Sequence, residues 1–167
     1  MSEPAPTVAD GQLHSLDPRV IPLQQITGTL FTAAIAAGSM AFLVLRILTE
    51  RTPPWWLAVW AVLVLVGFWH AVSWPARAYE HTFYRVDDQG IEIRRGVYWR
   101  VVINVPRSRV QHIDVSQGPI ERRYGLGTLI IYTAGTDYAK VALEGLEHGR
   151  ALAIREHLLP SGATDAV

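Results

Sequence analysis

Residues 26–45 read ITGTLFTAAIAAGSMAFLVL and residues 55–74 read WWLAVWAVLVLVGFWHAVSW, and neither run holds a charged side chain. A helix over residues 26–48 would be about 34 Å long at roughly 1.5 Å per residue, enough to cross a hydrocarbon core of about 30 Å. Lipid offers no partners for backbone N–H and C=O groups, so an apolar run of this length closes its hydrogen bonds internally as a helix. We therefore predict two membrane-spanning helices, over about 26–48 and 55–74.

The link between the two runs is short, which forces an antiparallel hairpin with both ends of the chain on one side of the membrane. Arg46 and Arg51 lie in or beside this link. Four arginines lie before the first span or within about 20 residues after the second; they are Arg19, Arg77, Arg85 and Arg94. Because lysine and arginine are enriched in cytoplasmic loops, the sequence predicts a multi-pass protein of the cell membrane with both termini in the cytoplasm.

The composition of the whole chain narrows the function classes. A length of 167 residues with 50% hydrophobic content allows the hairpin and one small domain. The alternative, two core helices of a soluble protein, needs more chain than this to cover both helices on every side. A net charge of +0 argues against a nucleic-acid binder, and the absence of cysteine excludes disulfides, thiolate metal sites and a cysteine nucleophile.

From Tyr79 onward, short alternating runs replace the apolar ones. In Ile91-Glu92-Ile93-Arg94 the isoleucines would face a core and the charges solvent. The strand predicted over 98–105 places Trp99, Val101, Ile103 and Val105 on one face, with Arg100 and Asn104 on the other. Further strands are expected over 82–86, 110–115, 128–133 and 140–143, and a helix over about 147–159.

These elements predict an α+β membrane protein, in which a two-helix transmembrane hairpin precedes a small antiparallel β-barrel closed by a C-terminal helix. The expected boundaries are a disordered tail over 1–24, the hairpin over 25–77, the β domain over 78–160 and a second tail over 161–167. A start rich in proline, with almost no periodic apolar pattern, is the reason for the first tail.

Four segments of the β domain carry a family resemblance. They are Tyr84-Arg85-Val86-Asp87-Asp88-Gln89-Gly90-Ile91, Val105-Pro106-Arg107-Ser108-Arg109-Val110-Gln111-His112-Ile113-Asp114-Val115, Gly118-Pro119-Ile120-Glu121-Arg122-Arg123-Tyr124-Gly125-Leu126-Gly127 and Tyr132-Thr133-Ala134-Gly135. In this order, after two apolar runs, the chain resembles the bacterial membrane-anchored PH-like domain family of the YdbS type. The resemblance covers roughly residues 16–159. It implies a pleckstrin-homology-like barrel held at the cytoplasmic face by the hairpin, with no known catalytic residue and no established ligand.

Two arginine pairs are the candidate site for an anionic headgroup or a partner. They are Arg107 and Arg109, which follow Pro106, and Arg122 and Arg123, which lie between two strands. Arginine binds phosphate bidentately, and each basic side chain near an anionic leaflet adds about 1 kcal/mol of attraction. The alternative is that they are solvated or paired with nearby acids. A strand of about seven residues spans roughly 23 Å, so the one between the pairs predicts two separate basic sites.

No residue pattern supports catalysis or a metal. The histidines lack the short helical spacing of a metalloprotease site, and no Ser-His-Asp order, paired carboxylates or cofactor fingerprint is present. The small residues of the first run, such as Ala36, Gly38 and Ser39, offer a face to a neighbouring helix.

We therefore predict a non-catalytic, membrane-anchored binding or assembly module without a cofactor. Its expected partners are the lipid bilayer, anionic headgroups and another membrane protein or a second copy, but no nucleic acid. The alternative function is an accessory subunit of a transporter or larger membrane complex that acts mainly through the hairpin.

Overall fold

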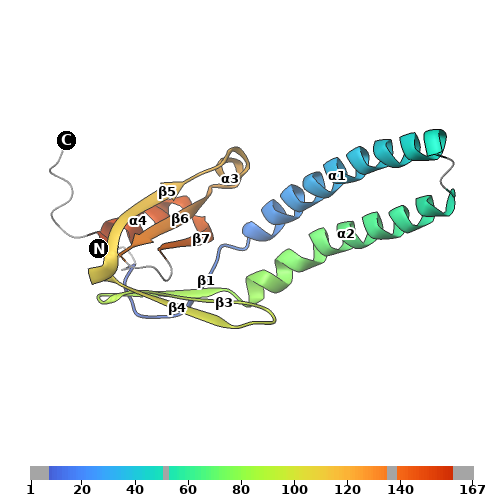
Figure 1. The fold of residues 1–167 in the computed structure, drawn as a ribbon. Helices are drawn as coiled ribbons and strands as arrows, with labels where there is room; N and C mark the ends of the chain where they lie inside the picture. Colours follow the sequence, from blue (N-terminus) through green and yellow to red (C-terminus); the bar gives the residue numbers. More distant parts are fainter. Residues whose placement is uncertain (1–7, 51–52, 135–138, 160–167) are drawn as a thin grey trace. The chain divides into compact units, whose positions relative to one another are not determined.

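The computed structural model describes residues 8–50, 53–134 and 139–159, and Figure 1 shows the order of the elements. The chain divides into two compact units. The first is a β domain that contains residues on both sides of the hairpin, with bounds Met1–Val20 and Ala78–Val167. The second is the helical hairpin, Ile21–Arg77. The predicted tail after residue 160 lies outside the described residues.

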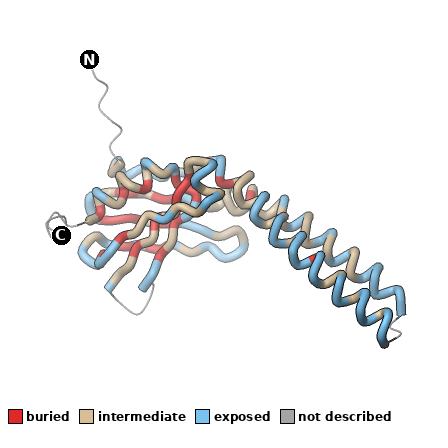
Figure 2. The backbone as a smooth tube through the Cα atoms, turned by 90° about the horizontal axis from the view of Figure 1, so that it is seen from above, coloured by how far each residue is buried: buried red, intermediate tan, exposed pale blue. Residues whose placement is uncertain are grey.

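The hairpin consists of α1 (Val20–Glu50) and α2 (Trp55–Glu80). Both helices are long and apolar enough to cross a membrane, and only 6% of the most apolar window of each is buried. Figure 2 shows the same exposure along both helices. Each is longer than the predicted span, and α2 continues through Pro75 to Glu80. The two predicted helices are confirmed, and the exposed apolar surface is what a lipid-facing pair requires.

Small side chains bring the two helices together. A Cβ on Gly28 would lie 3.3 Å from the Cβ of Ala71, and the Trp60 indole donates a 2.9 Å hydrogen bond to the Ser39 hydroxyl. Ala36 of α1 is buried. Part of the small-residue face of α1 is therefore used inside the hairpin, as small residues allow helices to approach closely.

The β domain is built from two antiparallel sheets and a C-terminal helix. One sheet has the order β1-β2-β3-β4 and the other β5-β6-β7. The strands are β1 (His14–Ser15), β2 (Phe83–Asp87), β3 (Gly90–Arg95), β4 (Val101–Pro106), β5 (Val110–Ser116), β6 (Leu126–Thr133) and β7 (Lys140–Glu147). The short helices η1 (Arg107–Arg109) and α3 (Pro119–Tyr124) flank β5, and α4 (His148–Leu158) packs on the second sheet. The predicted α+β class, with antiparallel sheets and a C-terminal helix after the two apolar helices, is confirmed.

The core follows the alternation of each strand. In β3, Ile91 and Ile93 are buried and Arg94 is exposed, as predicted. Helix α4 buries Ala151, Ile154 and Leu158, which lie on one stripe at spacings of three and four residues. Each side chain of this stripe is fully enclosed, so α4 closes the core of the domain.

Residues 8–20 belong to the β domain, whereas a disordered tail was predicted over 1–24; residues 1–7 of that predicted tail lie outside the described residues. Strand β1 pairs with β2, with Ser15 opposite Phe83, and the Asp17 amide donates a 3.0 Å hydrogen bond to the Gly145 carbonyl of β7. Leu16 and Val20 are 8% and 3% exposed. The segment is ordered by strands more than 60 residues away in the sequence, so its own residues show no periodic apolar pattern that would predict its structure.

Two further elements differ from the sequence prediction. Strand β4 begins at Val101, so Trp99 lies in the loop before it and is 85% exposed; its predicted place within the strand is wrong. Helix α3 lies in the segment between two predicted strands, where no helix was predicted. Its six residues are too few to show a helical period in the sequence.

Candidate functional site

The β domain has two distinguishable ends. Strand β1 runs to Ser15 and leads into α1 at Val20, and β2 begins at Phe83, three residues after α2 ends at Glu80. Because Ser15 pairs with Phe83, both chain connections to the hairpin leave from one end of the first sheet. We call this the anchor end. The opposite end, where β2 turns into β3 at Asp87–Gly90, is the distal end.

The first predicted pair, Arg107 and Arg109, lies at the distal end. Helix η1 follows β4, whose last residue Pro106 pairs with Gly90, and the Arg107 amide donates a 2.7 Å hydrogen bond to the Gln89 carbonyl. The Arg107 guanidinium donates a 2.9 Å bond to the Leu159 carbonyl after α4. Arg107 therefore has a structural role, because it satisfies a carbonyl that the helix end leaves without a partner. Arg109 is exposed.

The second predicted pair, Arg122 and Arg123, lies across β5 from the first. Both side chains are exposed in the last turn of α3. Gly125, which ends this helix, adjoins Arg19, since a Cβ on Gly125 would lie 3.4 Å from the Arg19 Nη1. Arg19 directly precedes α1, so α3 belongs to the anchor end. The structure does not bring the two pairs together, because the seven residues of β5 separate them.

Arg19 itself is occupied by a carboxylate. Its Nε and Nη2 donate bonds of 2.9 Å and 2.7 Å to the two oxygens of Asp17. This bidentate pair lowers the pKa of Asp17 from its ordinary value of 3.8. The pairing occupies the Arg19 guanidinium just before α1.

A third group of arginines surrounds a cavity at the anchor end. The cavity has a volume of about 490 Å³, within the usual range of roughly 300–1,000 Å³ for small-molecule sites. We call it the arginine cavity. Its lining residues are Glu80, His81, Phe83, Arg94, Arg95, Gly96, Arg100, Val101 and Val102.

The register of three strands assembles the arginine cavity. Phe83 of β2 lies opposite Arg94 of β3, and Arg94 lies opposite Val102 of β4. Arg95 pairs with Val101 at the last rung of the hairpin. Alternation along a strand predicts that Arg94 and Arg95 face opposite ways, yet both line the arginine cavity, because the cavity lies at the end of β3 rather than on one of its faces.

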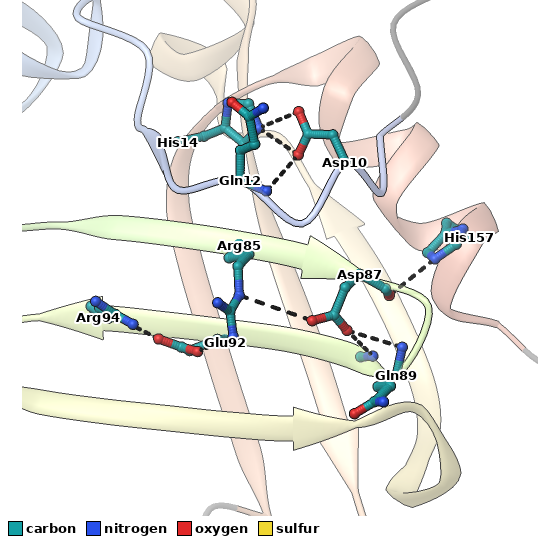
Figure 3. Close-up of polar contacts among 10 residues, drawn as sticks. Asp10, Gln12, His14, Arg85, Asp87, Gln89, Glu92, Arg94 and His157 are labelled. Carbon is teal, nitrogen blue, oxygen red and sulfur yellow. Dashed lines mark hydrogen bonds and ion pairs between the residues drawn. The ribbon is translucent and has the colours of Figure 1, made fainter.

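The charges of the arginine cavity favour an anion. Three arginines line it against one glutamate, Glu80. Glu92 forms an ion pair with the Arg94 guanidinium and accepts a 2.8 Å bond from Arg85, as Figure 3 shows for Arg94. Within residues 8–50, 53–134 and 139–159, the side chains of Arg95 and Arg100 form no hydrogen bond or ion pair with another residue. These two guanidinium groups are therefore available to a ligand.

The distal end offers a cavity of the opposite character. It measures about 350 Å³ and contains Asp87 and Glu92 against one arginine, Arg85. Asp87 uses its Oδ1 to accept bonds from the amides of Gln89 and Gly90, which shapes the β2–β3 turn (Figure 3). This cavity is less suited to an anion. Among the described residues, no group of three or more histidine, aspartate or glutamate side chains could hold a metal ion.

Sequence reasoning missed the arginine cavity although its residues were visible. Arg94, Arg95 and Arg100 stand within seven residues of each other, on both sides of Gly96. The signal was the position of this cluster at the turn between β3 and β4. Because β3 runs antiparallel to β2, this turn lies beside the first residues of β2. Alternation along the strand assigned Arg94 and Arg95 to opposite faces and so argued against a shared patch, whereas both line the cavity.

Comparison with known proteins agrees with the fold. The chain matches the family model described as bacterial PH domain over residues 20–161, which includes both apolar helices and most of the β domain. It is 42% identical over 67 residues to the UPF0699 transmembrane protein YdbS of Bacillus subtilis (strain 168), an alignment that covers 40% of this chain and 42% of that protein. No solved structure matches the chain. Because the family model spans far more than half of the sequence, this membrane protein belongs to the bacterial PH domain family.

Proposed function

We propose that this chain is a non-catalytic membrane module whose PH domain binds anionic, phosphate-bearing lipid headgroups at the cytoplasmic face. The observation that supports this function best is the arginine cavity. It combines Arg95 and Arg100, which have no partner among the described residues, with a place at the end of the domain that joins the hairpin. Guanidinium groups bind phosphate oxygens bidentately, and lysine could not replace them with the same geometry.

Connectivity supports access of this cavity to the bilayer. The apolar part of α2 ends at Trp74, and the helix continues six residues to Glu80, or about 9 Å at roughly 1.5 Å per residue. Headgroup layers occupy about 5–8 Å on each side of the hydrocarbon core. Glu80 and His81 line the arginine cavity, so the chain that links the apolar part of α2 to the cavity is little longer than one headgroup layer. A lipid headgroup is therefore the anion that this cavity meets at the highest local concentration.

The test uses the full-length chain in a neutral detergent. Binding of a short-chain phosphatidylglycerol and of the matching phosphatidylcholine is measured by microscale thermophoresis at low and high salt. We expect preference for phosphatidylglycerol and weaker binding at high salt. The variant R95Q/R100Q should lose about 10- to 30-fold in affinity, since each basic side chain contributes about 1 kcal/mol.

The chain offers a matched control for this variant. R109Q/K140Q also removes two positive charges, but Arg109 and Lys140 lie where η1 and the start of β7 meet the distal end. Its affinity should equal that of the natural chain. The variant R122Q/R123Q measures the predicted second pair separately. Equal binding of the two lipids by the natural chain, or equal loss in the distal control, would refute headgroup recognition by the arginine cavity.

A second candidate function, an accessory subunit that acts through the hairpin, is favoured by the outer side of α1. Ala33, Ala34, Ala37 and Gly38 are exposed, and a Cβ on Gly38 would have no atom within 4 Å. A partner helix could approach this side closely. Photo-crosslinking in native membranes distinguishes the candidates: a specific adduct from a photoreactive residue at position 34, abolished by G38L, supports the accessory function.

A further inference from the structure

The loop between β3 and β4 presents two aromatic side chains to solvent. Tyr98 is 79% exposed and Trp99 is 85% exposed. Soluble domains rarely leave adjacent large aromatic residues so open, because their contact with water is unfavourable. The exposure continues onto the sheet, where Val102 is 54% exposed and Phe83 is 37% exposed. We call Tyr98, Trp99, Val102 and Phe83 the aromatic rim.

The loop has a defined conformation that depends on Gly96. This residue has a φ of +123°, and a Cβ there would lie 1.8 Å from the Trp99 carbonyl oxygen. Any other residue would collide with the backbone of the loop. The chain therefore turns tightly at Gly96 and carries Tyr98 and Trp99 beyond the last paired rung, Arg95 opposite Val101.

The position of the loop within the β domain matches its chemistry. Phe83 begins β2 directly after α2, and it lies in one cross-strand row with Arg94 and Val102. The β3–β4 loop is thus at the anchor end. From Glu80 to Phe83 the chain spans at most about 10 Å, so the chain that links the apolar part of α2 to the start of the sheet is short, at most about 20 Å.

We propose that the aromatic rim inserts into the bilayer interface and forms a third attachment of the PH domain, in addition to the two chain connections. Indole and phenol rings have an apolar body and a polar edge, which favours the level of the lipid headgroups. Arg95 and Arg100 flank the loop, and their guanidinium groups complement phosphate beside the inserted rings. An apolar protein groove would offer no role for these two unpaired cations.

This inference rests on the membrane anchoring of the chain and is independent of the proposed headgroup selectivity. Insertion of the aromatic rings requires a bilayer but does not depend on the charge of its headgroups. Headgroup recognition by the arginine cavity requires an anionic lipid. The two proposals therefore separate when neutral and anionic bilayers are compared.

The test takes advantage of the absence of cysteine in the natural chain. V97C places a single thiol beside the intact aromatic pair, and D88C places one in the exposed distal turn as a control. Each full-length variant is labelled with an environment-sensitive nitrobenzoxadiazole dye and reconstituted into nanodiscs. The nanodiscs contain phosphatidylcholine alone or with phosphatidylglycerol, and nitroxide-bearing lipids serve as quenchers.

We expect a blue-shifted emission and strong quenching for the label at residue 97 in both lipid mixtures, and neither effect at residue 88. Adding Y98S/W99S to V97C should abolish the shift and the quenching, and circular dichroism should show an unchanged fold, since both side chains are exposed. Quenching at residue 97 equal to that at residue 88 overturns the proposal. A blue shift without lipid quenching also overturns it, because it shows a protein surface, such as a second copy, on the rim.

Discussion

Replacing Leu16 by alanine tests the finding that the segment before the hairpin is part of the β domain. Leu16 is 8% exposed and lies between β1 and Asp17, whose amide is bonded to Gly145 of β7. Truncation of a buried leucine costs about 2–5 kcal/mol. Because Leu16 lies at the margin of the core, we expect the lower part of this range, about 2–3 kcal/mol.

Hydrogen exchange of the full-length protein in detergent measures this loss directly. A loss of about 2–3 kcal/mol makes protected amides exchange roughly 30- to 150-fold faster when they open through this region. The acceleration should appear in peptides from residues 14–20 and from β2, and the Asp17 amide should be the most affected.

Leu13 provides the matched control in the same segment. It is 47% exposed, so L13A should change the free energy of unfolding by no more than about 0.5 kcal/mol. Equal exchange in L16A and L13A would refute the inclusion of this segment in the core. It would also restore the sequence-based boundary, in which a fragment starting at residue 78 contains the whole domain.

The remaining predictions concern two carboxylates, the packing of the hairpin and the orientation of the chain in the membrane. The pKa of Asp17 is lowered chiefly by its hydrogen bonds to Arg19, and that of Asp10 chiefly by the Gln12 amide and His14. The stability that the two carboxylates contribute is therefore complete above about pH 3.8 and is lost as the pH falls below it. Exchange protection of residues 14–20 should consequently fall with acid more in the natural chain than in D10N/D17N. G28L should destabilise the hairpin by about 1–3 kcal/mol in a detergent melt, because Gly28 packs against Ala71, whereas G38L on the open side should leave the melting temperature unchanged. In intact cells an impermeant thiol reagent should label P53C and not D88C if both termini are cytoplasmic, and the reverse pattern would show the opposite orientation.

Local features of the sequence were sufficient for much of this architecture. The two apolar runs determined the hairpin, because hydrophobicity over about 20 residues depends only on composition. The alternation of Ile91 and Ile93 with charged residues determined the buried face of β3, and the spacing of Ala151, Ile154 and Leu158 determined the buried face of α4. Each pattern is complete within one element, so no knowledge of its neighbours is needed.

The tertiary structure decided the features that depend on distant pairing. Strand β1 is only two residues long and exists because it pairs with β2, nearly 70 residues later. Trp99 continues the alternation of β4, yet the turn at Gly96 leaves it outside the sheet. The arginine cavity forms because the register of β2, β3 and β4 returns Arg94, Arg95 and Arg100 to the anchor end. Register is set by which strand faces are buried and by the turns that join paired strands, and a single sequence does not state which of its strands are neighbours.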